Sequence, residues 1–134
     1  MTIALDTSIV LALYNPRDER HGDVVGWYEH VDEDLVTTPV LVAEMDYLVT
    51  QRAGRDVAAL LWEDLDSGAM AVRWWSTAMA ETVAIARERP ALGLADASLL
   101  ALAPVVRTTR IATLDRTHFH SARTREGTPF VLLP

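Results

Sequence analysis

The stretch "IALDTSIVLALY", residues 3–14, places one acid, Asp6, inside an otherwise apolar run. An ionised carboxylate is costly to bury without a partner. Aspartate is also a good helix N-cap, so Asp6 can end a short strand and cap a helix that starts near Ser8. The stretch alone therefore leaves two interpretations open, a structural cap and a functional carboxylate, and the rest of the chain must separate them.

Five short apolar runs alternate with longer amphipathic segments along the chain. Runs of this kind predict strands, and the segments between them predict helices. Strands that alternate with helices favour an α/β fold with a mainly parallel sheet. The predicted strands are "TIALD" (2–6), "LVTT" (35–38), "MAVRWW" (70–75), "RIATL" (110–114) and "PFVLL" (129–133).

Prolines, glycines and hydroxyl residues predict where the helices begin and end. Proline suits the first turn of a helix, whereas further along it terminates or kinks the helix. We expect helix starts at Thr38–Pro39 and at Ser76 or Thr77, helix ends at Gly54 and Pro90, and an end or a kink at Pro104.

The length of the chain, 134 residues of which 50% are hydrophobic, allows one substantial core without disulfides or metals. We expect a single domain over residues 1–134. The sequence contains no Cys, which fits a reducing compartment. Its longest uncharged apolar stretch, residues 97–106, is too short to span a bilayer, and residues 1–6 do not resemble a secretory signal. These features predict a cytoplasmic protein.

Charge is distributed unevenly along a chain whose net charge is −7. Residues 1–66 hold fourteen acids against four Arg, whereas residues 87–125 hold seven Arg against three acids. A negative net charge argues against a polyanionic partner, yet the asymmetry permits a basic face on an acidic protein. All twelve basic residues are Arg, whose guanidinium group suits phosphate.

Two acids lie at the carboxyl ends of predicted strands: Asp6 is the last residue of one, and Asp115 directly follows another. In open parallel sheets, ligands bind beyond the carboxyl ends of the strands. A third acid, Glu44, lies in the predicted helix 39–52, about 60° around the axis from the buried Leu41. Glu44 is either an ordinary salt-bridged side chain or a further site residue, whereas Asp46 on the same helix is expected to face solvent.

The fourth acid is Asp96, in "LGLADASLLALA". Gly93 interrupts what precedes it and an apolar helix follows, so Asp96 can be an N-cap. Asp115 can likewise cap the short "RTHF" segment. Capping explains each aspartate separately, but it does not explain why acids recur at one edge of the predicted sheet.

Convergence of Asp6, Glu44, Asp96 and Asp115 would bring like charges together. Two such charges about 4 Å apart repel by roughly 4 kcal/mol at an effective dielectric constant near 20. Four together imply raised pKa values or a bound cation. Oxygen ligands without Cys favour Mg²⁺ or Mn²⁺ over Zn²⁺, and such an ion can polarise a phosphodiester and activate water.

In this order and at these separations, four segments resemble the PIN-domain family and, within it, the VapC-type toxins of bacterial toxin–antitoxin pairs. They are "ALDTS" (4–8), "VLVAEMDYLV" (40–49), "LADASLLALA" (94–103) and "IATLDRTHF" (111–119). The resemblance implies a three-layer α/β/α sandwich with a mainly parallel central sheet. It also implies a Mg²⁺- or Mn²⁺-dependent endoribonuclease, in which a metal-activated water cleaves the RNA phosphodiester.

The resemblance also implies roles for individual residues. Thr7 or Ser8 would orient the first carboxylate or a metal-bound water, and Thr113 would assist near the fourth. The acids that correspond to the family's catalytic metal ligands are Asp6, Glu44, Asp96 and Asp115.

Three partners follow from the same resemblance: a cognate VapB-type antitoxin, an RNA substrate of the tRNA or ribosomal RNA class, and a second copy of the chain. Apolar helix surface near Trp27, Tyr28 and Leu48 is a candidate site for an antitoxin helix. Surplus aromatic residues such as Trp62 and Trp75 fit a homodimer.

Other residues allow functional and structural interpretations. His118 and His120 have a spacing that can ligate a metal on a strand, but after "LDRT" a turn is expected, with the ring of His118 or Phe119 packed inward. Trp74 and Trp75 can stack on RNA bases, or one can face the core and the other the surface. Five arginines are either RNA-phosphate contacts or surface charges: Arg107, Arg110, Arg116, Arg123 and Arg125.

Other functional classes remain to be weighed. Response-regulator receivers and haloacid-dehalogenase phosphatases also place Asp at strand ends, but both normally need a Lys, which this chain lacks. The dehalogenase type also needs Asp-x-Asp, whereas position 8 is Ser8. The remaining alternative is a non-catalytic PIN-like module that only binds RNA or protein, against which the presence of all four acids argues.

Overall fold

The computed structural model of the chain describes all residues from 1 to 134. Its centre is a sheet of five parallel strands in the order β3-β2-β1-β4-β5. The strands are β1 (Thr2–Leu5), β2 (Asp34–Thr37), β3 (Ala71–Val72), β4 (Arg110–Ala112) and β5 (Val131–Leu133). The helices are α1 (Thr7–Tyr14), α2 (His21–Glu29), α3 (Pro39–Ala53), α4 (Arg55–Ser67), α5 (Ala78–Glu88), the 3-10 helix η1 (Pro90–Leu92), α6 (Gly93–Val105) and α7 (Arg116–Phe119).

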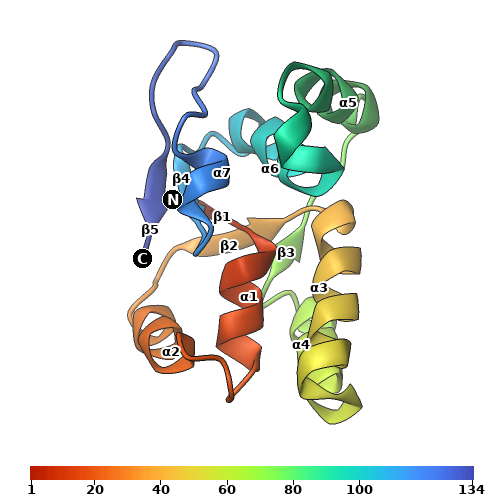
Figure 1. Ribbon diagram of the computed structural model, residues 1–134, viewed down its shortest axis with the longest axis vertical. Coiled ribbons are helices and arrows are strands. Elements are labelled where there is room, and N and C mark those ends of the chain that lie inside the picture. Colours follow the sequence, from red (N-terminus) through yellow and green to blue (C-terminus); the bar gives the residue numbers. More distant parts are fainter.

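The direction in which the chain crosses the sheet decides where the helices lie. Crossovers between parallel strands are nearly always right-handed. The chain first moves outward from β1 through β2 to β3, which places α1 to α4 on one side of the sheet. It then returns past β1 to β4, which places α5 and α6 on the other side, as Figure 1 shows. The expected three-layer α/β/α sandwich is therefore confirmed.

This reversal of direction makes β1 and β4 neighbours at the centre of the sheet. Their carboxyl ends are joined by a hydrogen bond from the Asp6 amide to the Ala112 carbonyl oxygen, at 3.0 Å. Such a switch point is where doubly wound sheets bind ligands. The fold thus brings the residue after β1 and the residues after β4 to the preferred location for a site.

The core lies on both faces of β1 and around α6. In β1, Ile3, Ala4 and Leu5 are all buried, and in α6 every residue from 96 to 103 is buried. Burial on all sides explains why α6 is apolar all round rather than amphipathic. No helix of the chain has the length and the apolar character needed to cross a membrane.

The predicted helix boundaries agree with the structure. Thr38 caps α3 by accepting a hydrogen bond from the Leu41 amide at 3.2 Å, and Gly54 ends the helix with a φ of 93° that suits glycine. Pro104 is the penultimate residue of α6, so it ends the helix rather than kinking it. The main difference concerns "MAVRWW", in which only Ala71 and Val72 form a strand.

Candidate active site

Asp6 occupies the N-cap position of α1, but its side chain does not cap the helix. The carboxylate is 4% exposed, and its Oδ2 atom accepts hydrogen bonds from Ser8 Oγ at 2.8 Å and from Thr113 Oγ1 at 2.7 Å. The Oδ1 atom makes no hydrogen bond. The capping interpretation is therefore wrong for this side chain, which is held by one oxygen with the other left free.

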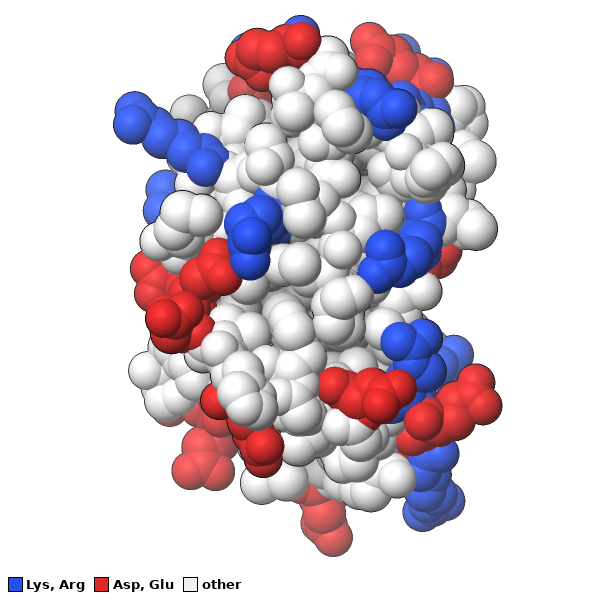
Figure 2. Space-filling model, turned by 90° about the vertical axis from the view of Figure 1, so that its left-hand side faces the viewer, with Lys and Arg blue, Asp and Glu red and all other residues white.

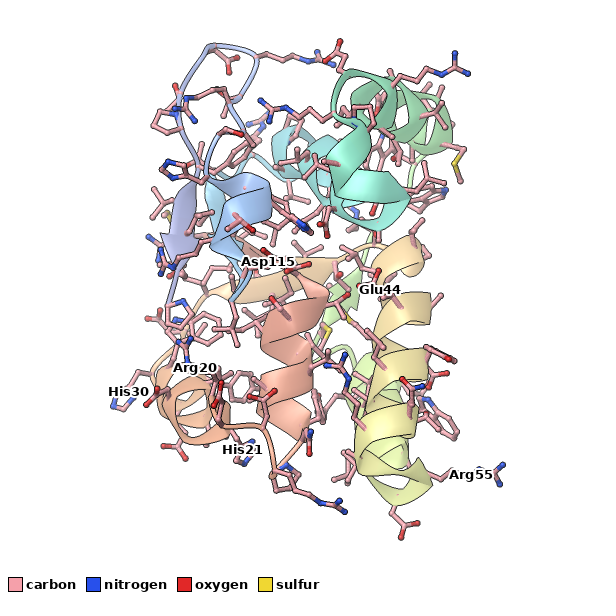
Figure 3. All side chains as sticks on the ribbon, in the orientation of Figure 1. Arg20, His21, His30, Glu44, Arg55 and Asp115 are labelled. Atoms are coloured by element: carbon pink, nitrogen blue, oxygen red, sulfur yellow. The ribbon has the colours of Figure 1, made fainter.

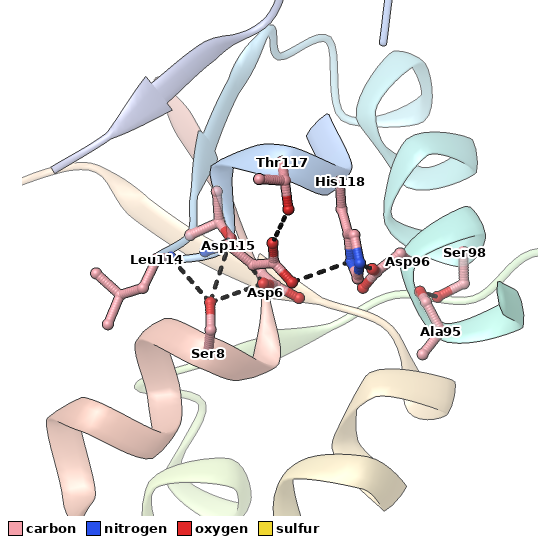
Figure 4. A network of polar contacts seen from close by, with 10 residues as sticks. Asp6, Ser8, Ala95, Asp96, Ser98, Leu114, Asp115, Thr117 and His118 are labelled. Atoms are coloured by element: carbon pink, nitrogen blue, oxygen red, sulfur yellow. Dashed lines mark hydrogen bonds and ion pairs between the residues drawn. The ribbon is translucent and has the colours of Figure 1, made fainter. Parts of the chain in front are cut away.

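The two hydroxyl groups that hold Asp6 are themselves fixed by the segment after β4. Ser8 Oγ accepts a hydrogen bond from the Leu114 amide at 2.8 Å, and Thr113 Oγ1 accepts one from the Asp115 amide at 2.9 Å. Of the two residues expected to orient Asp6, Ser8 does so, whereas the Thr7 hydroxyl is buried without a partner. This network, drawn in Figure 4, sets the positions of Asp6 and Asp115 relative to one another.

Asp115 stands at the N-cap position of the short helix α7, and again the side chain makes no capping bond. Its Oδ1 atom accepts a hydrogen bond from Thr117 Oγ1 at 2.8 Å, and its Oδ2 atom lies 3.1 Å from His118 Nδ1. The carboxylate is half-buried. It thus keeps one face open to solvent, unlike Asp6.

Asp96 is not an N-cap, because α6 begins three residues earlier, at Gly93. Its carboxylate is buried, with a residue exposure of 8%, and its Oδ2 atom lies 2.6 Å from His118 Nδ1. Burial and the charges of Asp6 and Glu44 together raise the pKa of Asp96 to about 6, although the hydrogen bond and charge of His118 act in the opposite direction. The shift places three acids within electrostatic reach of one another.

Glu44 comes from the second turn of α3 and is half-buried. Figure 3 shows its side chain on the side of α3 that faces the start of α1 and α7, toward Asp115. It forms no hydrogen bond or ion pair, but its charge contributes to the raised pKa of Asp96. The structure therefore brings all four predicted acids to one end of the sheet.

A buried chain of hydroxyl groups fixes α3 against α6. Thr38 Oγ1 lies 2.7 Å from Ser98 Oγ, and Ser98 in turn donates a hydrogen bond to the Ala95 carbonyl oxygen at 2.6 Å. Because Thr38 begins the helix that carries Glu44 and Ala95 directly precedes Asp96, this chain sets the spacing of those two acids.

The sequence interpretation considered His118 as a metal ligand together with His120 or as a ring packed inward, whereas in the structure the ring contacts two of the acids. Phe119 packs inward, at 1% exposed, and the ring of His118 turns toward the acids instead. Burial alone would lower the pKa of His118, but the hydrogen bond to Asp96 and the charges of Asp115, Asp96 and Asp6 outweigh it and raise the pKa. The only signal in the sequence was its position three residues after Asp115, where a helical turn places both side chains on one face.

The donor set fits a hard divalent cation in its chemistry, since carboxylate oxygens are the ligands that Mg²⁺ and Mn²⁺ prefer. Burial is the main cause of the raised pKa of Asp96, and repulsion by Asp6 and Glu44 adds to it. As the side chains stand, however, no three acidic or histidine side chains are arranged to hold a metal ion. Binding would require the carboxylates to close around the ion, and His118 lies between two of them.

Several other predicted candidates lie elsewhere. Asp46 is not simply solvated, because it is half-buried and accepts a hydrogen bond from Trp62 Nε1 at 2.5 Å. Trp75 packs against the core while Trp74 is 38% exposed, as the structural interpretation of that pair expected.

The five arginines of the C-terminal third do not form one cluster. Arg110 pairs with Glu33 at 2.9 Å, and Arg107 follows α6 at the opposite end of the sheet from the acids. Figure 2 shows basic and acidic side chains interspersed over the face that carries β5, without one continuous basic patch. Arg116, Arg123 and Arg125, which follow Asp115 in the chain, remain candidates for phosphate contact.

The chain is similar to known proteins in its sequence and in its fold. The PIN domain family matches residues 3–123. The chain is 34% identical over 133 residues to a protein of Mycobacterium tuberculosis (strain ATCC 25618 / H37Rv) named Ribonuclease VapC26, covering 97% of this chain and 98% of that one. The crystal structure of M. tuberculosis VapC20, described as a Sarcin-Ricin loop cleaving toxin, superposes with a TM-score of 0.81 at 19% identity over 90% of this chain and 95% of that chain. At that identity the second likeness establishes the fold.

Proposed function

Because the chain belongs to the PIN domain family, we propose that it is a Mg²⁺- or Mn²⁺-dependent endoribonuclease of the VapC toxin type. The observation that carries the proposal is the gathering of Asp6, Glu44, Asp96 and Asp115 at the switch point of the sheet, where burial and, to a smaller extent, the charges of Asp6 and Glu44 raise the pKa of Asp96. Four acids that share a single histidine carry an excess of like charge, which supports a site that binds a cation.

The four acids have different parts in this proposal. Asp6 offers its free Oδ1 atom from the most rigid position, because Ser8 and Thr113 fix its other oxygen. Asp96 and Asp115 offer oxygens that now contact His118. Glu44 completes the set from α3. A bound Mg²⁺ or Mn²⁺ would supply Lewis-acid polarisation of the phosphodiester and a water of lowered pKa.

The substrate in this proposal is RNA of the tRNA or ribosomal RNA class, the class to which the sarcin-ricin loop named for VapC20 belongs. Arg116, Arg123 and Arg125 would contact its phosphates from the segment after Asp115. Arg89 supports that segment by donating hydrogen bonds to Ser121 Oγ at 3.2 Å and to the Ser121 carbonyl oxygen at 3.0 Å. Guanidinium groups near the acids would offset their repulsion of the polyanion.

A VapB-type antitoxin is the proposed protein partner. The apolar residues Leu13, Tyr14, Trp27 and Tyr28 line a small hollow between α1, α2 and α4, and we propose that an apolar helix of the antitoxin docks on this surface. Leu48, the third residue named from the sequence, packs against the core from α3. We also propose a homodimer, for which the 52% exposure of Trp62 offers apolar surface.

The test is cleavage of a panel of structured RNAs by the purified protein in Mg²⁺, in Mn²⁺ and in excess chelator, with the cleavage ends mapped. We expect cleavage in either metal that leaves 5′-phosphate ends, and none in chelator. The Glu44→Gln variant should be strongly impaired. Asp46→Asn on the same helix is the matched control, because asparagine still accepts the hydrogen bond from Trp62.

Two outcomes would redirect the assignment. RNA binding without cleavage in either metal would favour the non-catalytic PIN-like module instead. Cleavage at the same rate in chelator would contradict a metal-dependent enzyme.

A further inference from the structure

The ring of His118 stands between two of the four acids. Its Nδ1 atom lies 2.6 Å from Asp96 Oδ2 and 3.1 Å from Asp115 Oδ2. The contact with Asp96 is a hydrogen bond, in which Nδ1 is the donor when the carboxylate is ionised, and the contact with Asp115 is an ion pair. One nitrogen thus links α6 to the start of α7, as Figure 4 shows.

The position of this ring is set by packing. The next residue, Phe119, is buried at 1% exposed and anchors the single turn of α7 to the core. His120 follows on the exposed side of that turn, and its side chain contacts no carboxylate. The anchored turn leaves the ring of His118, with 40% of its side chain exposed, at the edge of the acidic site.

A cation held by the Oδ2 atoms of Asp96 and Asp115 would need the same oxygens that His118 contacts. A hydrogen-bonded N–H and a metal ion cannot both lie close to the same carboxylate lone pairs. The ring therefore satisfies the acids in the metal-free protein in a way that opposes metal binding.

We propose that His118 is a positioning residue that competes with the divalent cation: it bridges Asp96 and Asp115 in the metal-free protein, and metal binds only as the ring releases them. This inference rests on the proposed metal site. The ring and the metal ion compete for the same carboxylates, so each weakens the binding of the other to the same extent. Removal of the ring should therefore strengthen metal binding, and addition of metal should free the ring.

The first experiment measures the affinity of Mn²⁺, without RNA, for the wild type, His118→Ala, His118→Gln and the control His120→Ala. Free Mn²⁺ is read by electron paramagnetic resonance. We expect His118→Ala to bind Mn²⁺ about fivefold to tenfold more tightly, a typical size for coupling between exclusive ligands, and to melt at a lower temperature in chelator. The Mn²⁺ affinity of His118→Gln should fall between those of the wild type and His118→Ala. His120→Ala should match the wild type in Mn²⁺ affinity and in melting temperature.

Equal or weaker Mn²⁺ binding by His118→Ala would overturn the inference, since a merely structural residue or a metal ligand would behave in that way. Failure of every protein, the wild type included, to bind Mn²⁺ would overturn the proposed metal site and this inference with it. Neither readout depends on finding the RNA substrate.

A second measurement needs no variant at the site. Titration of the wild type with diamagnetic Mg²⁺ should shift the ring resonances of His118 in the NMR spectrum and leave those of His120 in place. Ring resonances of His118 that stay fixed while Mg²⁺ saturates the protein would contradict release of the ring.

Discussion

At the amino ends of the strands, Arg110 reaches Glu33 at 2.9 Å, and the Thr108 hydroxyl donates a hydrogen bond to the Thr2 carbonyl oxygen at 2.6 Å. At the carboxyl ends of the same sheet, the nearest charged neighbours of Asp6 and Asp96 are other acids and a single histidine. A charge that serves only stability is normally paired or exposed. At the amino end Arg110 and Glu33 pair one to one, whereas at the carboxyl end four acids share one histidine. This excess of negative charge distinguishes a functional edge from a structural one.

The largest expected effect comes from Asp6→Asn at the carboxyl end. Asparagine caps a helix about as well as aspartate, so a capping role predicts almost no change. As a metal ligand, Asp6 loses a negative charge and a hard oxygen donor, and we expect RNA cleavage in Mg²⁺ to fall at least about a hundredfold. The melting temperature in chelator should hold or rise, because one member of a repelling cluster is neutralised.

The next effect concerns the support of that ligand. Thr113→Val removes the hydroxyl that donates to Asp6 and accepts from the Asp115 amide, in a side chain that is 0% exposed. Loss of such support for a ligand typically reduces activity about tenfold or more. The rate of RNA cleavage is measured for Thr113→Val and for Thr113→Ser. Thr113→Ser should keep most of the wild-type rate because serine retains the hydroxyl group, whereas Thr113→Val should not.

The corresponding change at the amino end is Glu33→Gln. It removes one charge of a partly buried pair, which should lower the free energy of unfolding by about 1 kcal/mol. Denaturant unfolding measures this loss, and RNA cleavage by the folded variant should match the wild type. Reduced cleavage at full folding would show that the two edges are not independent.

A smaller effect is the pH dependence of stability in chelator. The pKa of Asp96 is about 6 in the folded protein and 3.8 in its ordinary state, so the folded state binds the proton more tightly. Stability from this group is therefore fully present below about pH 4 and is lost as the pH rises through 6. We expect Asp96→Asn to melt above the wild type at pH 7 and to converge with it near pH 4, in paired thermal melts.

Much of this arrangement could be predicted from the sequence. Asp6 and Asp115 each follow a strand, and parallel strands end at one edge, so their proximity follows from the fold class. Residues that are close in the chain can still lie at opposite edges of the sheet. Arg110 begins β4 and Asp115 follows its end, and because a strand rises about 3.3 Å per residue, the strand separates Arg110 from Asp115. The pairing of Arg110 with Glu33, far away in the chain, is a tertiary contact.

Orientation within short segments could not be predicted. "RTHF" permits either His118 or Phe119 to pack inward, and the choice depends on the core that surrounds it. The bond between Asp46 and Trp62 likewise depends on how α3 packs against α4. Helical periodicity assigns a face to each residue, but it does not identify the neighbour that covers that face.

The central claim, that the carboxyl edge binds a cation, is tested most directly by the melting temperature with and without saturating Mn²⁺. Three proteins are compared: the wild type, Asp6→Asn at the carboxyl edge and Glu33→Gln at the amino edge. Each variant replaces one carboxylate by the corresponding amide, so the comparison tests at which edge of the sheet the lost negative charge matters. Metal that binds the folded state stabilises it by about 2.7 kcal/mol at a hundred times its Kd. We predict that Mn²⁺ raises the melting temperature of the wild type and of Glu33→Gln equally and has little effect on Asp6→Asn. An equal rise in all three would contradict a metal site at Asp6.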